Sequence, residues 1–230
     1  MSMLNLKIEK FFKYFGITLN ESFKDTFNEV LEELNFRKEV YKMNFREEIF
    51  KYQPINEQEA NDKQIILDYI DHFYNNILTR ENQIAHMTSS GLILNKSLDK
   101  MLMIYHKIYN TWAWTGGHAD GEDDMLKVAL KEAVEETGIS NIVPLSDNIA
   151  SIDIIPVYGH FKKGKYVSSH LHLNITYILI ADENERLIVN EDETSGVKWI
   201  EVSKLSEYSN EPYLVEIYNK IIDKAKKIKL

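Results

Sequence analysis

The segment between Gly116 and Ile139 constrains this chain more than any other part of its sequence. It contains three glutamates, Glu132, Glu135 and Glu136, whose i, i+3 and i+4 spacing places them within one sector of an α-helix, about 100° wide. The apolar stripe by which this helix would pack on a sheet consists of Leu126, Ala129, Leu130 and Ala133. Carboxylates this close repel one another unless a cation lies among them, and Mg²⁺ prefers such oxygen ligands. The spacing alone leaves two interpretations, a metal site and a solvated acidic face.

Glycines lie near both ends of the predicted helix. Gly116 and Gly117 allow the backbone to turn sharply in front of it and bring backbone carbonyls near the carboxylates. Gly138 predicts a C-cap, and we expect the helix over residues 120–137. A carboxylate-bearing helix beside an open glycine turn suits a bound metal and a diphosphate, which favours the metal-site interpretation.

The segment resembles the Nudix box, the family signature G-x5-E-x7-R-E-U-x-E-E-x-G-U, in which U is a bulky apolar residue. Gly117 stands at the first glycine, and Ala133 is a small occupant of the first U position. The remaining matches are Glu132, Glu135, Glu136, Gly138 and Ile139. Two positions depart from the signature, because Asp123 replaces a glutamate and Lys131 replaces the arginine. Both keep the sign of the charge, but Asp is shorter and Lys lacks the bidentate fork of Arg.

The resemblance implies an α+β fold, a Nudix-type α/β/α sandwich with a mixed β-sheet, over residues 83–230. Residues 1–82 are then a helical extension, which we expect to pack on this domain or to build a homodimer. Nudix hydrolases cleave a nucleoside diphosphate linked to another moiety and use Mg²⁺ or Mn²⁺. The alternative is a non-catalytic Nudix module that senses a ligand. Such modules tend to lose the box carboxylates, which this chain retains.

The resemblance also implies roles for individual residues. Glu132, Glu135 and Glu136 match the catalytic carboxylates, with Glu135 and Glu136 as metal ligands and Glu132 as general base or additional ligand. The Gly116 carbonyl and Glu193, from a later acidic turn, are candidates for further metal ligands. The positions that match the structural brace of the loop–helix–loop are Gly117, Asp123, Lys131 and Gly138. An ion pair between Asp123 and Lys131 would form part of that brace.

Four further residues are candidate substrate contacts. His170 and His172 alternate with apolar residues along the predicted strand 166–181, so they share one face of it. His118 belongs to the glycine turn, and Trp114 precedes that turn. The alternatives are a solvent-facing sheet surface or a His-x-His metal site for the strand histidines, bracing of the turn for His118, and core packing for Trp114.

The rest of the chain mixes helices and strands without regular alternation. Helices are predicted over 4–14, from about 20 to 34, over 57–78 and over 211–227. Strands are predicted over 85–94, 100–106, 149–158, 166–181 and 197–200, with a hairpin tip at 162–165. An α+β layered fold follows from this order.

Composition narrows the function further. The chain of 230 residues has no cysteine, which excludes disulfides and thiolate metal sites. Its formal net charge of −9 opposes broad capture of nucleic acid. The sequence shows neither the apolar core of a signal peptide nor a membrane-length apolar run. We therefore expect a cytoplasmic protein without a membrane partner, whose partner is a small nucleoside diphosphate derivative.

Overall fold

The computed structural model describes residues 44–162, 164–189 and 194–229. Residues 44–230 form one compact unit, and the helices predicted over 4–14 and 20–34 lie outside the described residues. In the described part of the chain, no helix is both long and apolar enough to cross a membrane.

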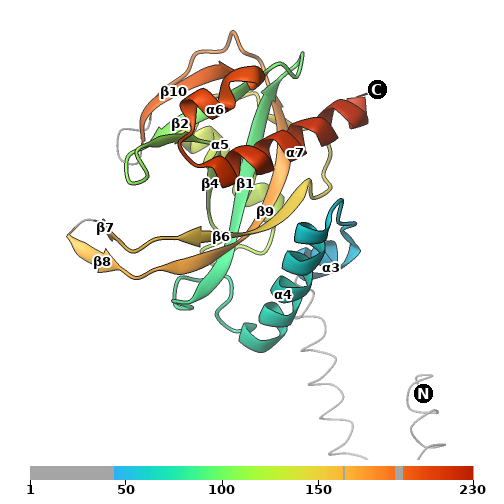
Figure 1. The fold of residues 1–230 in the computed structure, drawn as a ribbon, viewed down its shortest axis with the longest axis vertical. Coiled ribbons are helices and arrows are strands. Elements are labelled where there is room, and N and C mark those ends of the chain that lie inside the picture. Colours follow the sequence, from blue (N-terminus) through green and yellow to red (C-terminus); the bar gives the residue numbers. More distant parts are fainter. Residues whose placement is uncertain (1–43, 163, 190–193, 230) are drawn as a thin grey trace, which may run out of the picture. The chain divides into compact units, whose positions relative to one another are not determined.

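A mixed sheet of eight strands forms the centre of the described unit (Figure 1). The long strands β1 (Ala85–Asn95) and β9 (His170–Ala181) pair in parallel at its middle. The main strand order is β10-β2-β1-β9-β5, with β3 paired to β2, β4 to β1 and β6 to β9. All of these other pairings are antiparallel. The remaining strands of the sheet are β2 (Lys100–His106), β3 (Thr111–Ala113), β4 (Thr115–His118), β5 (Val143–Pro144), β6 (Ser151–Val157) and β10 (Thr194–Glu201).

A separate two-stranded hairpin projects from one end of β6 and β9. It consists of β7 (His160–Lys162) and β8 (Lys165–Val167), which confirms the predicted hairpin tip. The strand predicted over 166–181 is instead divided into β8 and β9, which belong to different sheets. The other strands predicted from the sequence form with bounds within a few residues of those expected.

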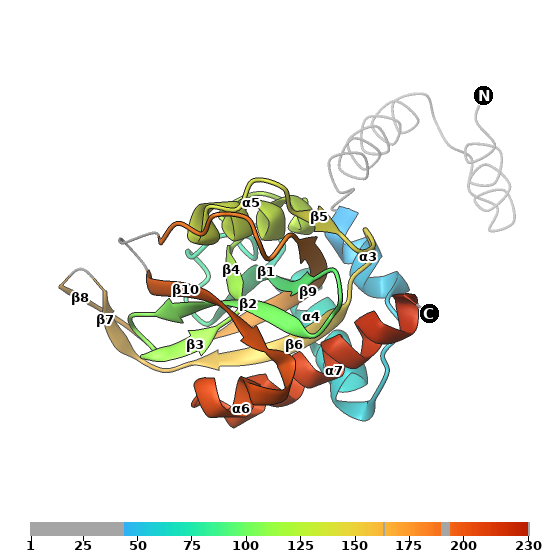
Figure 2. The same ribbon diagram turned by 90° about the horizontal axis from the view of Figure 1, so that it is seen from above.

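Helices cover both faces of the sheet (Figure 2). Helix α5 (Met125–Thr137) lies on one face, where it contacts β1, β4 and β9. The opposite face carries α4 (Glu57–Phe73), α6 (Leu205–Tyr208) and α7 (Pro212–Lys229). Helix α3 (Asn44–Lys51) packs against α4, and a short 3₁₀ helix, Val202–Lys204, precedes α6. This arrangement confirms the predicted α+β sandwich with a mixed sheet and preceding helices.

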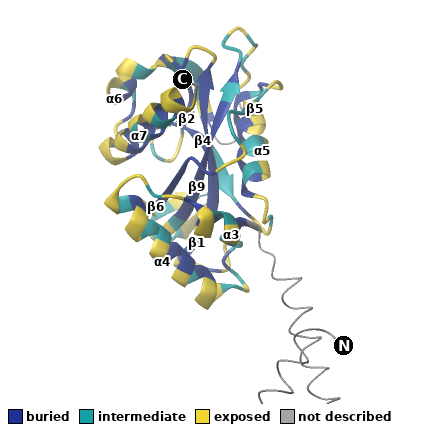
Figure 3. Ribbon diagram, turned by 90° about the vertical axis from the view of Figure 1, so that its right-hand side faces the viewer, coloured by how far each residue is buried: buried dark blue, intermediate teal, exposed yellow. Residues whose placement is uncertain are grey.

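A large apolar cluster of the described residues lies between the sheet and α7. Its members include Leu92, Leu94, Met101, Met103, Trp114, Ile178, Tyr218 and Ile221. The strands are buried along most of their length, whereas the outer helix surfaces are exposed (Figure 3). Trp114 immediately precedes β4, so burial of this cluster anchors the chain at the start of that strand.

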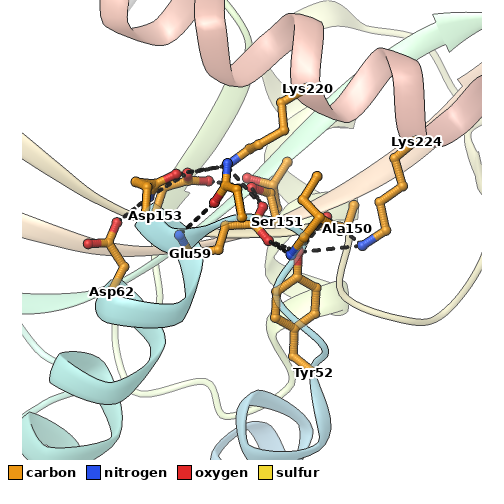
Figure 4. A network of polar contacts seen from close by, with 12 residues as sticks. Tyr52, Glu59, Asp62, Ala150, Ser151, Asp153, Lys220 and Lys224 are labelled. Carbon is orange, nitrogen blue, oxygen red and sulfur yellow. Dashed lines mark hydrogen bonds and ion pairs between the residues drawn. The ribbon is translucent and has the colours of Figure 1, made fainter.

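A buried polar network joins α4 to the sheet and to α7 (Figure 4). Lys220 of α7 places its Nζ 2.9 Å from Oε1 of Glu59 and 2.7 Å from Oδ1 of Asp153. The Tyr52 hydroxyl donates to Oε2 of Glu59 over 2.7 Å, and the Ser151 hydroxyl donates to Asp153 over 2.6 Å. Glu59 and Asp153 are fully buried, so these partners compensate the cost of removing two carboxylates from water. The described residues before β1, from residue 44 onward, therefore pack on the sheet domain, as one of the two predicted alternatives requires.

Two predicted helices are shorter in the structure. Helix α5 begins at Met125 rather than at residue 120, because the side chain of Asp124 caps it by accepting from the Lys127 N–H over 2.9 Å. The two residues at the predicted start, Asp120 and Gly121, have φ values of 47° and 94°, which are incompatible with a right-handed helix. Helix α4 ends at Phe73 instead of residue 78.

Candidate active site

The end of α5 brings a buried glutamate against the glycine turn. The backbone N–H of Gly116 in β4 donates a hydrogen bond of 3.0 Å to Oε2 of Glu136. Only 3% of Glu136 is exposed. A carboxylate that accepts a backbone hydrogen bond in such a position is held in one orientation. This contact between residues 20 positions apart thus joins the first and last parts of the predicted metal site.

Glu132 lies against the second glycine. A Cβ atom added to Gly117 would be 2.4 Å from Cδ of Glu132, and 2.7 and 2.8 Å from its two carboxylate oxygens. Any side chain at Gly117 would therefore displace the Glu132 carboxylate. Close approach, rather than a positive φ, is the reason that this position requires glycine.

Lys131 pairs with two box glutamates rather than with Asp123. Its Nζ lies 3.3 Å from Oε1 of Glu132 and 3.5 Å from Oε2 of Glu135. The charge of Glu132 is the main reason that the pKa of Lys131 is raised. Asp123 is exposed in the loop before α5, and within the described residues it forms no ion pair with Lys131. The expected charge pair of the brace is therefore replaced by a lysine that reduces repulsion between carboxylates.

The predicted C-cap is confirmed. Gly138 has φ 72°, in the left-handed region, and its N–H donates to the Val134 carbonyl over 2.9 Å. A Cβ atom at this glycine would also lie 2.5 Å from Cβ of Ile188. Gly138 thus ends α5 immediately after Glu135 and Glu136, which fits its predicted bracing role.

The donors at the glycine turn fit a divalent metal of the hard, oxygen-binding type. Glu132, Glu135 and Glu136 supply carboxylates of this type, although in the described residues their oxygens do not gather around one point. The Gly116 carbonyl stays a predicted ligand. The space that a Cβ would fill at Gly117 is occupied by the Glu132 carboxylate, so the turn is shaped around this residue. Glu193, the other candidate ligand, lies outside the described residues.

Trp114 lies in the apolar core. It is 8% exposed, belongs to the apolar cluster below α7, and has its ring centroid 5.1 Å from that of Tyr218. The structure therefore favours the core-packing alternative for Trp114 over stacking against a substrate.

The three histidines predicted as substrate contacts lie together, and a fourth joins them. We call His86, His118, His170 and His172 the histidine cluster; one ring nitrogen of each lies within 4.8 Å of those of the others. The parallel register of β1 and β9 pairs His86 with His172, and β4 adds His118 beside them. His86 looks like an isolated histidine in the sequence, and the parallel pairing that positions it has no local signal.

Burial disfavours the charged form of three histidines of the cluster. It lowers the pKa of His172 to about 2 and that of His118 to about 3, and it lowers the pKa of His86 as well. The same strand face continues with Asn174 and Thr176, which are 2% and 0% exposed. The alternative of a solvent-facing surface is therefore wrong for this part of β9.

Comparison with known proteins agrees with the fold and the glycine turn. The family model described as NUDIX domain matches residues 85–224, which is more than half of the chain. The chain belongs to the Nudix family. This finding confirms the resemblance carried by the box.

Solved structures similar to this chain include three hydrolases. A Clostridium perfringens hydrolase of the NUDIX family is 22% identical, with 60% of this chain and 96% of that chain covered and a TM-score of 0.43. The Escherichia coli dihydroneopterin triphosphate pyrophosphohydrolase is 11% identical, with 60% and 95% covered and a TM-score of 0.47. A Caenorhabditis elegans Ap4A hydrolase is 16% identical, with 58% and 93% covered and a TM-score of 0.41. Among curated protein sequences, none matches.

Proposed function

We propose that this protein hydrolyses the diphosphate linkage of a nucleoside diphosphate derivative with the help of Mg²⁺ or Mn²⁺. The observation that carries the proposal is the contact of two box glutamates with the two glycines of the turn. Glu136 is bound to the Gly116 N–H, and Glu132 fills the space beside Gly117. Membership of the Nudix family supports the type of reaction.

The three carboxylates have different surroundings, which suit them to different roles. Glu136 is buried and oriented by the backbone, so it suits a fixed metal ligand. The side chain of Glu135 is 52% exposed and can reach toward a substrate-bound cation from the helix edge. Glu132, with 15% of its side chain exposed, suits a general base or a further ligand. When bound, the metal supplies positive charge to the diphosphate oxygens and lowers the pKa of the attacking water.

Lys131 has a supporting role in this proposal. It lies between Glu132 and Glu135, so it lowers their mutual repulsion. An approaching cation would compete with Lys131 for the same oxygens. We therefore expect Lys131 to move away from at least one glutamate when metal and substrate bind.

The test is a screen of nucleoside diphosphate derivatives with the full chain, in Mg²⁺ or Mn²⁺ and in chelator. Products are detected as phosphate released after a phosphomonoesterase is added. We expect metal-dependent turnover of at least one compound, lost in Glu136→Gln and retained in the control Glu207→Gln, whose side chain is exposed on α6. Saturable binding of these compounds without turnover would favour the ligand-sensing alternative instead.

A further inference from the structure

The histidine cluster lies on the opposite side of β4 from the box glutamates. Gly117 faces Glu132 of α5, whereas a Cβ at Gly116 would point to Ser90 of β1. Because side chains alternate along a strand, His118 shares the face of Gly116. His86 and His172 are paired across β1 and β9, and Thr88 of β1 pairs with His118, so all three rings lie on that face. The cluster is therefore distinct from the proposed diphosphate site.

The four rings meet closely. The ring centroid of His86 lies 5.0 Å from the centroids of His118 and His170, and 5.4 Å from the centroid of His172. The Nε2 atoms of His170 and His172 are 3.2 Å apart. Four tetrahedral nitrogen ligands around Zn²⁺ would be separated by about 3.3 Å, given Zn–N bonds of about 2.05 Å. Among the described residues, these histidines are the one set of three or more His, Asp or Glu side chains gathered to hold an ion.

Two rings of the cluster form hydrogen bonds through Nδ1, which leaves their Nε2 atoms as acceptors. Nδ1 of His86 lies 2.9 Å from the Asn82 carbonyl, and Nδ1 of His170 lies 2.8 Å from the Ser168 carbonyl. A carbonyl only accepts, so each Nδ1 carries the proton and each Nε2 presents a lone pair. A backbone carbonyl on the second ring nitrogen is the usual support of a metal-ligating histidine.

His86 carries an unsatisfied atom that points to a ligand. The residue is 5% exposed, and within the described residues its Nε2 has no hydrogen-bond partner. A buried acceptor without a donor is costly, and proton uptake is opposed because burial lowers the pKa of this ring. A cation with affinity for imidazole would satisfy the atom.

We propose that the histidine cluster binds one Zn²⁺ ion, or a similar imidazole-preferring divalent ion such as Ni²⁺, at a site separate from the box glutamates. Four imidazole nitrogens suit Zn²⁺, whereas Mg²⁺ and Mn²⁺ prefer oxygen. With four protein ligands the site is structural, and it ties the ends of β1, β4 and β9 together. The positive charge of Arg80 opposes a cation here, but Arg80 forms a bidentate pair with the Asp120 carboxylate, at 2.6 and 2.9 Å.

The test uses the full chain stripped with chelator and titrated with Zn²⁺ against a chromogenic competitor, in millimolar Mg²⁺. We expect one equivalent bound with submicromolar affinity and an increase in melting temperature. His170→Gln and His172→Gln should each weaken Zn²⁺ binding at least tenfold. The matched control is His160→Gln in β7, a histidine outside the cluster, which should bind as the wild type does. Co²⁺ in place of Zn²⁺ should give the intense visible absorption of tetrahedral coordination in the wild type and in His160→Gln, but not in His170→Gln or His172→Gln.

Two results would overturn this site. One is a folded wild-type chain that binds no Zn²⁺ under these conditions. The other is an equivalent of Zn²⁺ that is lost in Glu136→Gln and kept in His172→Gln, because it would place the ion at the glycine turn. If His172→Gln unfolds, His170→Gln takes its place in the comparison with Glu136→Gln, because the His170 ring is partly exposed. Circular dichroism of each variant checks the fold.

Discussion

The N–H of Gly116 and the Oε2 of Glu136 are joined by a hydrogen bond of 3.0 Å between β4 and the last turn of α5. This bond orients a carboxylate that is nearly fully buried. A glutamine would keep the shape and the acceptor but remove the negative charge that a divalent cation requires.

Replacement of Glu136 should therefore separate folding from metal binding. We expect Glu136→Gln to weaken Mn²⁺ binding at least tenfold, about 1.4 kcal/mol, and to abolish most turnover. Calorimetric titration of the folded variant measures the affinity, with Glu207→Gln as the control for loss of one carboxylate. Unchanged Mn²⁺ affinity in folded Glu136→Gln would remove this residue from the metal site.

The second glycine of the turn gives a steric test of the same site. In Gly117→Ala, the new Cβ would meet the Glu132 carboxylate at 2.4–2.8 Å, so that side chain must move. We expect kcat to fall tenfold or more, with a stability loss of only about 1–3 kcal/mol. The control is Gly196→Ala in β10, where a Cβ would lie 3.1 Å from the ring of Trp112 and far from the glutamates in sequence. Equal kcat values for the two variants would contradict a positioned Glu132.

The ion pairs of Lys131 can be checked with double-mutant cycles. The structure predicts a coupling energy of about 0.3–0.5 kcal/mol between Lys131 and Glu135, because they form an exposed i, i+4 pair. Between Lys131 and Asp123 it predicts a coupling near zero. Chemical denaturation of the single and double alanine variants measures both values. A larger coupling for Lys131 with Asp123 would restore the brace expected from the family signature.

The parts of the site that the sequence predicts are those set by short-range spacing. The i, i+3, i+4 pattern places Glu132, Glu135 and Glu136 on one helix edge, and a glycine in the left-handed conformation ends that helix. The start of α5 was less predictable, since Asp120 and Asp124 are both suitable caps and only the backbone angles decide between them. The partner of Lys131 depends on side-chain choices within one turn, which a signature does not specify.

The histidine cluster could not be predicted because it depends on long-range register. His86 and His172 are 86 positions apart, and they meet only because β1 and β9 pair in parallel. The alternation along β9 correctly placed His170 and His172 on one face, but it could not show that this face is covered. A shift of one residue in that pairing would move His86 to the other face.

The buried network beneath α4 gives a prediction about acid stability. Burial raises the pKa of Glu59, but hydrogen bonds from the Ile55 N–H, Tyr52 and Lys220 outweigh it, so the net pKa of Glu59 is lowered. A lowered pKa in the folded state contributes stability above the unfolded-state pKa, and this contribution is lost as the pH falls through the folded-state value. Other groups facing Glu59 are Ser151, Asp153 and Lys224. Burial raises the pKa of Asp153, so its own contribution has the opposite sign.

Glu59→Gln isolates the first contribution. At pH 7 we expect this variant to be less stable than the wild type by about 3 kcal/mol, because Lys220 and Tyr52 lose a buried anionic partner. As the pH falls below about 4.5, the difference in unfolding free energy should shrink, since Glu59 of the wild type becomes protonated. Urea denaturation from pH 7 to 3 measures the difference, with Glu57→Gln, exposed in the first turn of the same helix, as the control. A constant difference across this range would show that folding does not shift the pKa of Glu59, and a difference that grows as the pH falls would show that Glu59 is not ionised in the folded protein.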